Sequence, residues 1–470
     1  MVLEQLMREL EEVRRKTVPS STPSTPYYTG PAGLFGVSGL DQQVISTHVS
    51  GQSLLTRLPF RATTVTNPLF PALTGFRDVS GSQPTGPCDD PQTAGSGKSC
   101  IQTAVFGRYS KQTRVLERNR LGQQINRGEF RDLTIVNNPI VGGGPDVPGS
   151  SPQALNLLNE VQARFLEVGV ALQREIGPQV YVGNPSNNTG SGGYEEFPGL
   201  DILIGTGKVD AITGTTCPSL DSLIRNFNYG NISTSTAAAT NAVAWITAMV
   251  RYFEETARST GLAPIGLAMV MRRSLFYELT AAWPCSYLTY RCNLGSNGQV
   301  VNVDARDQVE FRDSMRRESY LLIDGQRYEV IIDDFIDEDT NTENGSVTSG
   351  CFASDIYFVP LTVAGLYAGL FGEYFNYQGG ALEMASPRDF WSDGGRFLWH
   401  HKPPTNWCEQ WVVKTEPRLI LRTPHLAGRL TNVQYCPLIH ERDVDPDSAY
   451  HVNGGVTSRV GPSNYSEWQS

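Results

Sequence analysis

A long polar stretch that follows residue 75 and runs to about Arg131 limits the possible folds of this chain more than any other feature of the sequence. It shows no helical pattern, and its middle, from Val79 to Ser99, is rich in turn-forming residues, which predicts two extended limbs joined at a tip. Connections of this size without helices are uncommon in compact domains and usually serve a function. Because so polar a segment cannot bury itself, we predict a hairpin-like excursion that contacts a partner surface.

The limb that returns from this tip is basic. A basic strip binds either an acidic protein surface or the phosphates of a nucleic acid. The net charge of the chain, −10, disfavours a general nucleic-acid binder, because phosphate attraction needs surplus Lys and Arg. A nucleic-acid-binding protein that uses the limb 111–131 nevertheless stays an alternative. The basic residues of this limb are Lys111, Arg114, Arg118, Arg120, Arg127 and Arg131.

The chain begins with a short amphipathic segment on an extended arm. Leu3, Leu6 and Leu10 recur at three- and four-residue steps, which predicts a helix over residues 2–16. A Pro- and Ser-rich stretch over 19–26 follows and predicts a stiff linker. The helix either folds back on its own subunit or binds a neighbouring chain, and the sequence leaves both alternatives open.

The remaining pattern alternates between helices and strands and predicts an α+β fold with long appendages. A chain of 470 residues is too long for one ordinary core, so we expect more than one domain. The turn Asp324-Gly325 predicts a β-hairpin. The predicted helices cover 151–177, 236–259 and 272–282, and the predicted strands lie within 200–213, 265–271, 318–333, 356–377 and 411–421.

The eight cysteines are scattered and form no C-x-x-C pair, which disfavours a structural zinc site. No export signal is visible in residues 1–16, so we expect a soluble protein made in the cytoplasm, where most cysteines are buried thiols. The apolar run 356–371 is interrupted by Pro and Gly, so no membrane span is predicted. Two pairs are close enough in sequence to form disulfides later: Cys88 with Cys100, and Cys285 with Cys292.

Motifs with catalytic or ligand-binding chemistry fail on spacing. The segment 94–99 resembles a phosphate-binding loop, but Gln92 stands where that motif needs Gly. The acidic segment 337–348 resembles a calcium loop, but Thr342 and Thr348 replace its required Gly and Glu. No nucleophile or acid–base pattern is present. We therefore predict a protein that is not an enzyme, with no catalytic residue, no metal and no cofactor, although a hydrolase assembled from distant residues stays an alternative.

Three strings resemble patterns of one structural family. Residues 269–276 (MVMRRSLF) are similar to a strand that leads into a helix, 321–330 (LLIDGQRYEV) to a hairpin, and 416–427 (EPRLILRTPHLA) to a closing strand. With the order of elements over about residues 40–440, they resemble the major capsid proteins of tailed double-stranded-DNA bacteriophages, the Hong Kong-ninety-seven-type fold. Arg272-Arg273 departs from the family pattern, which commonly has a Met-Asn-Pro-like start.

The resemblance implies a division of the chain into five segments. They are an N-terminal helix and extended arm (1–60), an extended loop (61–140), a peripheral domain with a long spine helix (141–215), an axial domain (216–380), and a return to the peripheral domain with a C-terminal tail (381–470).

The resemblance also implies a function. The chain would self-assemble into hexamers and pentamers of an icosahedral shell, in the virion, after assembly in the host cytoplasm. Its inner surface would face packaged double-stranded DNA without sequence specificity, and scaffolding, portal or decoration proteins are further candidate partners. An encapsulin-like nanocompartment is the alternative with the same fold. The candidate contacts between subunits are Arg114, Arg118, Arg120, Arg127, Arg131, Leu3, Leu6 and Leu10, with Asp304, Asp307, Glu310 or the run Asp333–Asp339 as acidic acceptors.

Overall fold

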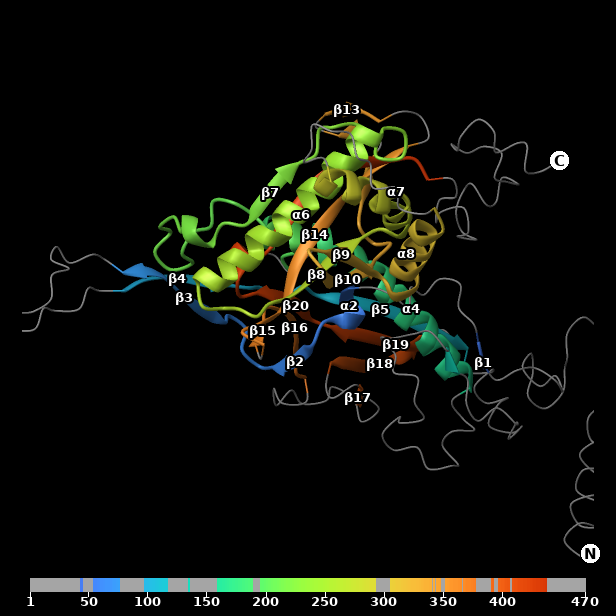
Figure 1. Cartoon of the computed structure of the whole chain (residues 1–470). Coiled ribbons are helices and arrows are strands. Elements are labelled where there is room, and N and C mark those ends of the chain that lie inside the picture. Colours follow the sequence, from blue (N-terminus) through green and yellow to red (C-terminus); the bar gives the residue numbers. More distant parts are fainter. Residues whose placement is uncertain are drawn as a thin grey trace, which may run out of the picture. The chain divides into compact units, whose positions relative to one another are not determined.

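The chain folds into two compact units, drawn in Figure 1. One unit comprises Met1–Gly51, Tyr109–Arg174 and Asn376–Thr415, and the other comprises Gln52–Arg108, Glu175–Phe375 and Glu416–Ser470. The structure, a computed structural model, describes residues 43–44, 54–76, 97–116, 134–135, 159–188, 195–292, 305–339, 341–342, 344–347, 351–365, 367–377, 390–392, 396–405 and 408–437.

The larger unit is built on a mixed sheet with the strand order β7-β21-β14-β8-β10-β9, and two short strands pair with β14. Strand β8 lies inside this sheet, and all but the first of its residues are buried, which explains its nearly continuous apolar sequence. The strands are β7 (Leu223–Asn226), β8 (Gly266–Met271), β9 (Tyr320–Ile323), β10 (Gln326–Ile332), β11 (Glu338–Asp339), β14 (Phe352–Val363), β15 (Tyr367–Ala368) and β21 (Gly428–Tyr435).

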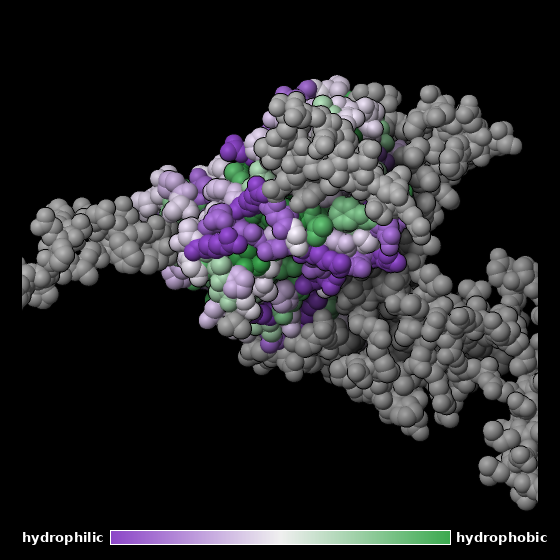
Figure 2. Space-filling model, viewed as in Figure 1, coloured by the Kyte–Doolittle hydropathy of each residue, from purple (hydrophilic) through white to green (hydrophobic). Residues whose placement is uncertain are grey.

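Three helices pack against this sheet: α6 (Thr236–Ser259), α7 (Arg273–Cys292) and α8 (Ala305–Glu318). Ser235 caps α6, because its hydroxyl accepts a hydrogen bond from the Ala238 amide at 3.3 Å. The buried stripe of α6 meets apolar side chains of β8, β14 and β21 in one core. Its opposite side carries exposed charges near the C-terminal end, where Figure 2 shows hydrophilic residues. The predicted helix 236–259 is therefore confirmed.

The hairpin predicted at Asp324-Gly325 is also confirmed, since β9 and β10 pair antiparallel on either side of it. Both turn residues have positive φ, 51° for Asp324 and 82° for Gly325, as a two-residue turn of this kind requires. The strand predicted over 265–271 is β8, and the helix that follows it is α7.

Two smaller sheets complete the elements of this unit that position the candidate site. A two-stranded ribbon is formed by β3 and β4, and a three-stranded sheet has the order β2-β16-β20. The bounds are α2 (Leu54–Arg57), β2 (Phe60–Thr63), β3 (Leu69–Phe76), β4 (Gly97–Thr103), α5 (Leu200–Leu203), β12 (Asn341–Thr342), β13 (Gly345–Ser346), β16 (Leu370–Phe375) and β20 (Pro417–Leu421), with 3-10 turns at Pro185–Asn187, Pro218–Leu220 and Pro424–Leu426.

The smaller unit contains a four-stranded antiparallel sheet with the order β17-β18-β19-β5. A short parallel pair, β1 with β6, belongs to the same unit. The chain crosses the boundary between the units within the long helix α4. The bounds are β1 (Gln43–Val44), β5 (Tyr109–Leu116), β6 (Thr134–Ile135), α4 (Asn159–Val182), β17 (Phe390–Ser392), β18 (Phe397–Thr405) and β19 (Cys408–Thr415).

The α+β class is confirmed, but several element bounds differ from the prediction. The long helix continues through Gly177 and Pro178 to Val182, and its predicted start at 151–158 lies outside the described residues. Residues 411–421 form two strands of different sheets, β19 and β20, with the break at Glu416. Helix α8 and strand β21 were not predicted. The predicted segment 381–470 is divided between the two units.

The strands predicted over 200–213 are wrong. This segment forms the short helix α5 and a turn, with Leu200 and Ile204 fully buried. The carboxylate of Asp210 accepts hydrogen bonds from the amides of Ile212 and Thr213, which closes a turn in place of a strand. None of the described helices is long and apolar enough to cross a membrane.

Candidate functional site

The β3–β4 ribbon stands apart from the main sheet of the larger unit. Its strands pair antiparallel from Leu69 opposite Thr103 to Phe76 opposite Gly97. Among the described strands, no other strand pairs with either of them. A two-stranded ribbon is marginal in water, and unpaired strand edges are templates for a further chain. The residues that hold its root, at the 69 and 103 ends, therefore define the candidate site.

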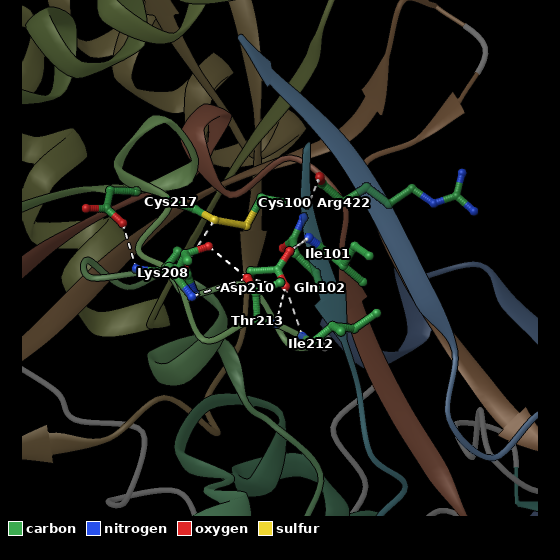
Figure 3. Close-up of a disulfide and its surroundings, with 11 residues drawn as sticks. Cys100, Ile101, Gln102, Lys208, Asp210, Ile212, Thr213, Cys217 and Arg422 are labelled. Atoms are coloured by element: carbon green, nitrogen blue, oxygen red, sulfur yellow. Dashed lines mark hydrogen bonds between the residues drawn. A yellow bond between two sulfur atoms is a disulfide. The ribbon is translucent and has the colours of Figure 1, made fainter. Parts of the chain in front are cut away.

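A disulfide holds the returning strand at this root. Cys100, on β4, is bonded to Cys217, with a Cα–Cα distance of 6.3 Å (Figure 3). Both cysteines are buried and pack with Leu220, and Ala72 of β3 contacts the same cluster. The predicted Cys88–Cys100 disulfide is therefore wrong, because Cys100 is bonded elsewhere. Cys88 lies outside the described residues.

Asp210 brings the segment that carries Cys217 to the edge of β4 (Figure 3). Its Oδ1 accepts the amides of Ile212 at 2.9 Å and Thr213 at 2.7 Å, and its Oδ2 accepts the amide of Ile101 at 2.7 Å. The Ala211 amide donates to the Ile101 carbonyl at 2.8 Å. The hydrogen bonds from the backbone of Thr213 and Ile101 lower the pKa of Asp210 to about 2. The carboxylate is therefore ionised at neutral pH and joins the 205–217 turn to β4.

Arg418 of β20 contacts the chain on both sides of the ribbon, just before β3 and just after β4. Its side chain is fully buried, and its Nη2 lies 2.5 Å from Oε2 of Glu373 on β16. The same guanidinium donates to the carbonyls of Val65 at 3.0 Å and Thr66 at 2.9 Å, just before β3. It also lies 4.0 Å from the ring centroid of Phe106, just after β4. A rigid fork of donors suits this arrangement better than a Lys ammonium does.

A second arginine of the same segment packs on the root. The Arg422 guanidinium lies 4.9 Å from the ring centroid of Phe371 and 5.8 Å from that of Phe70. Gln102 of β4 donates from Nε2 to the Arg422 carbonyl at 3.4 Å. Arg418 and Arg422 both lie in the string 416–427, which resembles a closing strand of the family, but their role at the ribbon was not predicted.

The basic limb does not form part of this ribbon. The returning strand of the ribbon ends at Thr103, and Lys111 and Arg114 lie on β5 in the sheet of the smaller unit. Arg114 is exposed and stands opposite Gln410 of β19. The other candidate contacts, Arg118, Arg120, Arg127, Arg131, Leu3, Leu6 and Leu10, lie outside the described residues.

The acidic run 333–339 is largely engaged within its own unit. Asp333 is 1 % exposed and accepts hydrogen bonds from the amides of Leu54 at 2.7 Å and Phe335 at 3.0 Å. Burial raises the pKa of Asp333 to about 6. Glu338 is buried beside Arg272, 3.5 Å away. The hypothesis that these two carboxylates face a neighbouring subunit is therefore wrong, whereas Glu310 on α8 is exposed.

The expectation of buried thiols is wrong for four cysteines. Besides Cys100–Cys217, a disulfide joins Cys351 and Cys436, next to the paired residues Phe352 and Tyr435 of β14 and β21. The backbone does not fit the other candidate pair, Cys285 with Cys292. Both positions lie in α7, and seven residues along one helix span about 10 Å, beyond the roughly 7 Å that a disulfide bridges.

Among the described residues, no group of three or more His, Cys, Asp or Glu side chains is placed to hold a metal ion. The root of the ribbon is a cluster of hydrogen bonds, an ion pair, contacts between arginines and aromatic rings, and a disulfide. Such a cluster supplies mechanical support to the ribbon.

No protein-family model and no curated protein sequence matches this chain. Solved structures do resemble it. The capsid asymmetric unit of Cyanophage A-1(L) has 12 % sequence identity and a TM-score of 0.46, over 84 % of this chain and 97 % of that chain. The capsid of Myoviridae Phage XM1 has 9 % identity and a TM-score of 0.40, over 84 % and 97 %.

The holo-SrpI encapsulin complex from Synechococcus elongatus PCC 7942 has 8 % identity and a TM-score of 0.39, over 90 % of this chain and 95 % of that chain. The first two structures are phage capsids, and the third is an encapsulin.

Proposed function

We propose that this chain is the major capsid protein of a tailed double-stranded-DNA bacteriophage, a shell protein that assembles with copies of itself into hexamers and pentamers. The observation that carries the proposal is the β3–β4 ribbon, which is fixed at its root and pairs with no other described strand. Its own subunit holds the ribbon at the root, and an isolated two-stranded ribbon gains stability from a further surface along its remaining length. In a protein built to self-assemble, that surface belongs to a neighbouring copy.

The exposed side chains at the ribbon root support this proposal. Val65 is 53 % exposed and Leu69 is 54 % exposed, although the Val65 carbonyl accepts a hydrogen bond from the buried Arg418 guanidinium. Apolar side chains next to unpaired strand edges favour association with another protein surface. The anchor and the exposed edge therefore have different roles, since the first fixes the ribbon to its own subunit and the second is available to a partner.

The order of elements also supports the proposal. The ribbon is followed by the long helix α4, the helix α6, the strand-to-helix step β8–α7, the hairpin β9–β10 and the closing strand β20. Apart from the strands expected over 200–213, this is the order of elements that the resemblance to the Hong Kong-ninety-seven-type fold implied. In this proposal the peripheral domain is built from the predicted segments 141–215 and 381–470. The axial domain is built from the predicted segment 216–380.

The remaining roles follow from the shell. The protein would be assembled in the host cytoplasm, become part of the virion, and act as a structural protein and not as an enzyme. With a net charge of −10, it would enclose DNA without a strongly basic inner face or sequence-specific contacts. Scaffolding, portal or decoration proteins would be additional partners.

A substitution at the exposed edge tests the proposal. Leu69→Lys places a charge beside the ribbon edge, where the single chain leaves the side chain open to water. We expect sedimentation velocity to show folded, unassembled subunits for this variant and large particles for the unchanged protein. Val309→Lys, at a side chain 46 % exposed on α8, is the matched control. Normal particles from Leu69→Lys would contradict the role of the ribbon in assembly.

A further inference from the structure

We propose that the Cys100–Cys217 disulfide closes after the subunit has folded, and that it then fixes the β3–β4 ribbon to the 205–217 turn when the protein enters oxidising surroundings. The reduced protein would have a ribbon that can leave this turn, and the oxidised protein would have one that cannot. This inference rests on the proposed function for its purpose. The bond would keep the ribbon in the position from which it contacts a neighbouring subunit.

Contacts that involve no sulfur atom already place the two cysteines together. The Asp210 carboxylate accepts the Ile101 amide at 2.7 Å, and the Ala211 amide donates to the Ile101 carbonyl at 2.8 Å. Ile101 is the neighbour of Cys100 in the chain. The Cα atoms of Cys100 and Cys217 are 6.3 Å apart, within the range that a disulfide spans. Folding thus creates the geometry, and the bond is added to it.

The 205–217 turn also keeps its shape without the disulfide. Asp210 closes the turn through the amides of Ile212 and Thr213 and the Thr213 hydroxyl. The amide of Cys217 donates to the Lys208 carbonyl at 2.6 Å. The turn is therefore a preformed docking surface for β4, and reduction is expected to release the ribbon from it without unfolding it.

The disulfide joins segments separated by 117 residues. The bond closes only when the ribbon is docked on the turn. Once closed, it excludes the conformations of the folded subunit in which the ribbon has left the turn. The second disulfide provides a contrast. Cys351 and Cys436 flank Phe352 and Tyr435, which are partners in the β14–β21 ladder, so their separation is set by strand pairing in either redox state.

The chemistry needs a two-electron oxidant, and the disulfide of glutathione is a suitable one. The thiolate of one cysteine attacks glutathione disulfide and releases one glutathione thiolate. The second cysteine thiolate then displaces the other glutathione from the mixed disulfide, which forms the Cys100–Cys217 bond. Overall the two protein thiols lose two electrons and two protons, and glutathione disulfide is reduced to two glutathione thiols.

Burial controls access to the bond. Cys100 is 0 % exposed and Cys217 is 6 % exposed, so an external thiol reaches the sulfur atoms when the ribbon leaves the turn. Since the closed bond itself prevents that movement, it protects itself from reductant. Cytoplasmic thiols therefore keep the two cysteines reduced before the bond closes, but they reduce the closed bond only slowly.

The test compares the protein purified under reductant before and after addition of glutathione disulfide. Mass spectrometry of peptides is expected to show a Cys100–Cys217 link with no retained glutathione. Hydrogen exchange of the β4 amides over 97–103 is expected to slow by at least about tenfold on oxidation, because open positions of the ribbon are removed. The variant Cys100→Ser/Cys217→Ser should show no such slowing, whereas Cys351→Ser/Cys436→Ser should show all of it.

Two results would overturn the inference: Cys100 and Cys217 that retain glutathione or remain open to alkylation, or equal exchange over 97–103 in both redox states. Particle formation, followed separately by light scattering, reports on the proposed function. Particles that form while exchange stays unchanged would remove the inference alone. A ribbon that becomes protected in a protein that never forms particles would remove the proposed function alone.

Discussion

The phenol of Tyr181 donates a hydrogen bond of 2.6 Å to Oδ2 of Asp333, which joins the end of α4 to the turn after β10. Both side chains are buried. The same carboxylate oxygen accepts the Leu54 amide, where α2 begins. A single buried carboxyl group therefore connects three segments of the larger unit that are far apart in the sequence.

This carboxyl group gives the stability of the fold a defined pH dependence. Burial raises the pKa of Asp333 to about 6, whereas an unfolded Asp titrates near 3.9. Between these values the folded state binds the proton more strongly, so the free energy of unfolding decreases as the pH rises from about 4 to about 6. The stabilising contribution is fully present below the lower value and is lost above the upper one.

Asp333→Asn removes this titration. We expect the difference in unfolding free energy between the unchanged protein and this variant to fall by up to about 3 kcal/mol from pH 4 to pH 7. Urea denaturation of unassembled subunits measures it. Asp313→Asn, at an exposed carboxylate, is the control. A difference for Asp333→Asn that stays constant with pH would contradict the assignment.

Removal of one partner of the Arg418–Glu373 pair is expected to be costly. Arg418→Met leaves a Glu373 carboxylate that is only 13 % exposed without its partner, and such changes destabilise by about 3–5 kcal/mol. The double variant Arg418→Met/Glu373→Leu should recover much of this loss, because the stranded charge is gone. Urea denaturation measures the unfolding free energies of the two variants and the unchanged protein. A single variant as stable as the unchanged protein would contradict the buried pair.

The basic limb gives a prediction about assembly. Arg114→Glu/Arg118→Glu is expected to prevent particle formation while leaving the subunit folded, because like charges at a complementary surface suppress pairing. Circular dichroism checks the fold, and electron microscopy checks the particles. Arg258→Glu/Arg327→Glu makes the same change in net charge at two exposed sites of the larger unit and serves as the control. Normal shells from the Arg114 variant would show that the limb is not an interface.

Local patterns in the sequence were sufficient for part of this fold. The turn Asp324-Gly325 defined its hairpin because few residues accept positive φ, and the apolar stripe of α6 defined a helix because its period matches the buried face. Both features depend on residues close together in the chain. The alternation over 411–421 likewise predicted extended structure, although it did not show that Glu416 divides two sheets.

The candidate site depends on contacts between distant residues, and local patterns contain little information about them. The pairing of Cys100 with Cys217 was missed because sequence proximity favoured Cys88. The sequence Asp210-Ala-Ile-Thr-Gly is a turn signature that could have been recognised, but its docking on β4 is a tertiary contact. The complete burial of Arg418 opposes the usual exposure of arginine and follows only from the positions of Glu373 and the ribbon ends.

The mass and contents of the assembled protein distinguish a phage capsid from the alternative functions. Light scattering and electron microscopy of the purified protein are predicted to show closed icosahedral particles of megadalton mass, and particles from infected cells are predicted to contain nuclease-protected double-stranded DNA. A protein cargo in place of DNA would favour an encapsulin-like compartment. A stable monomer or small oligomer under all conditions would contradict the account.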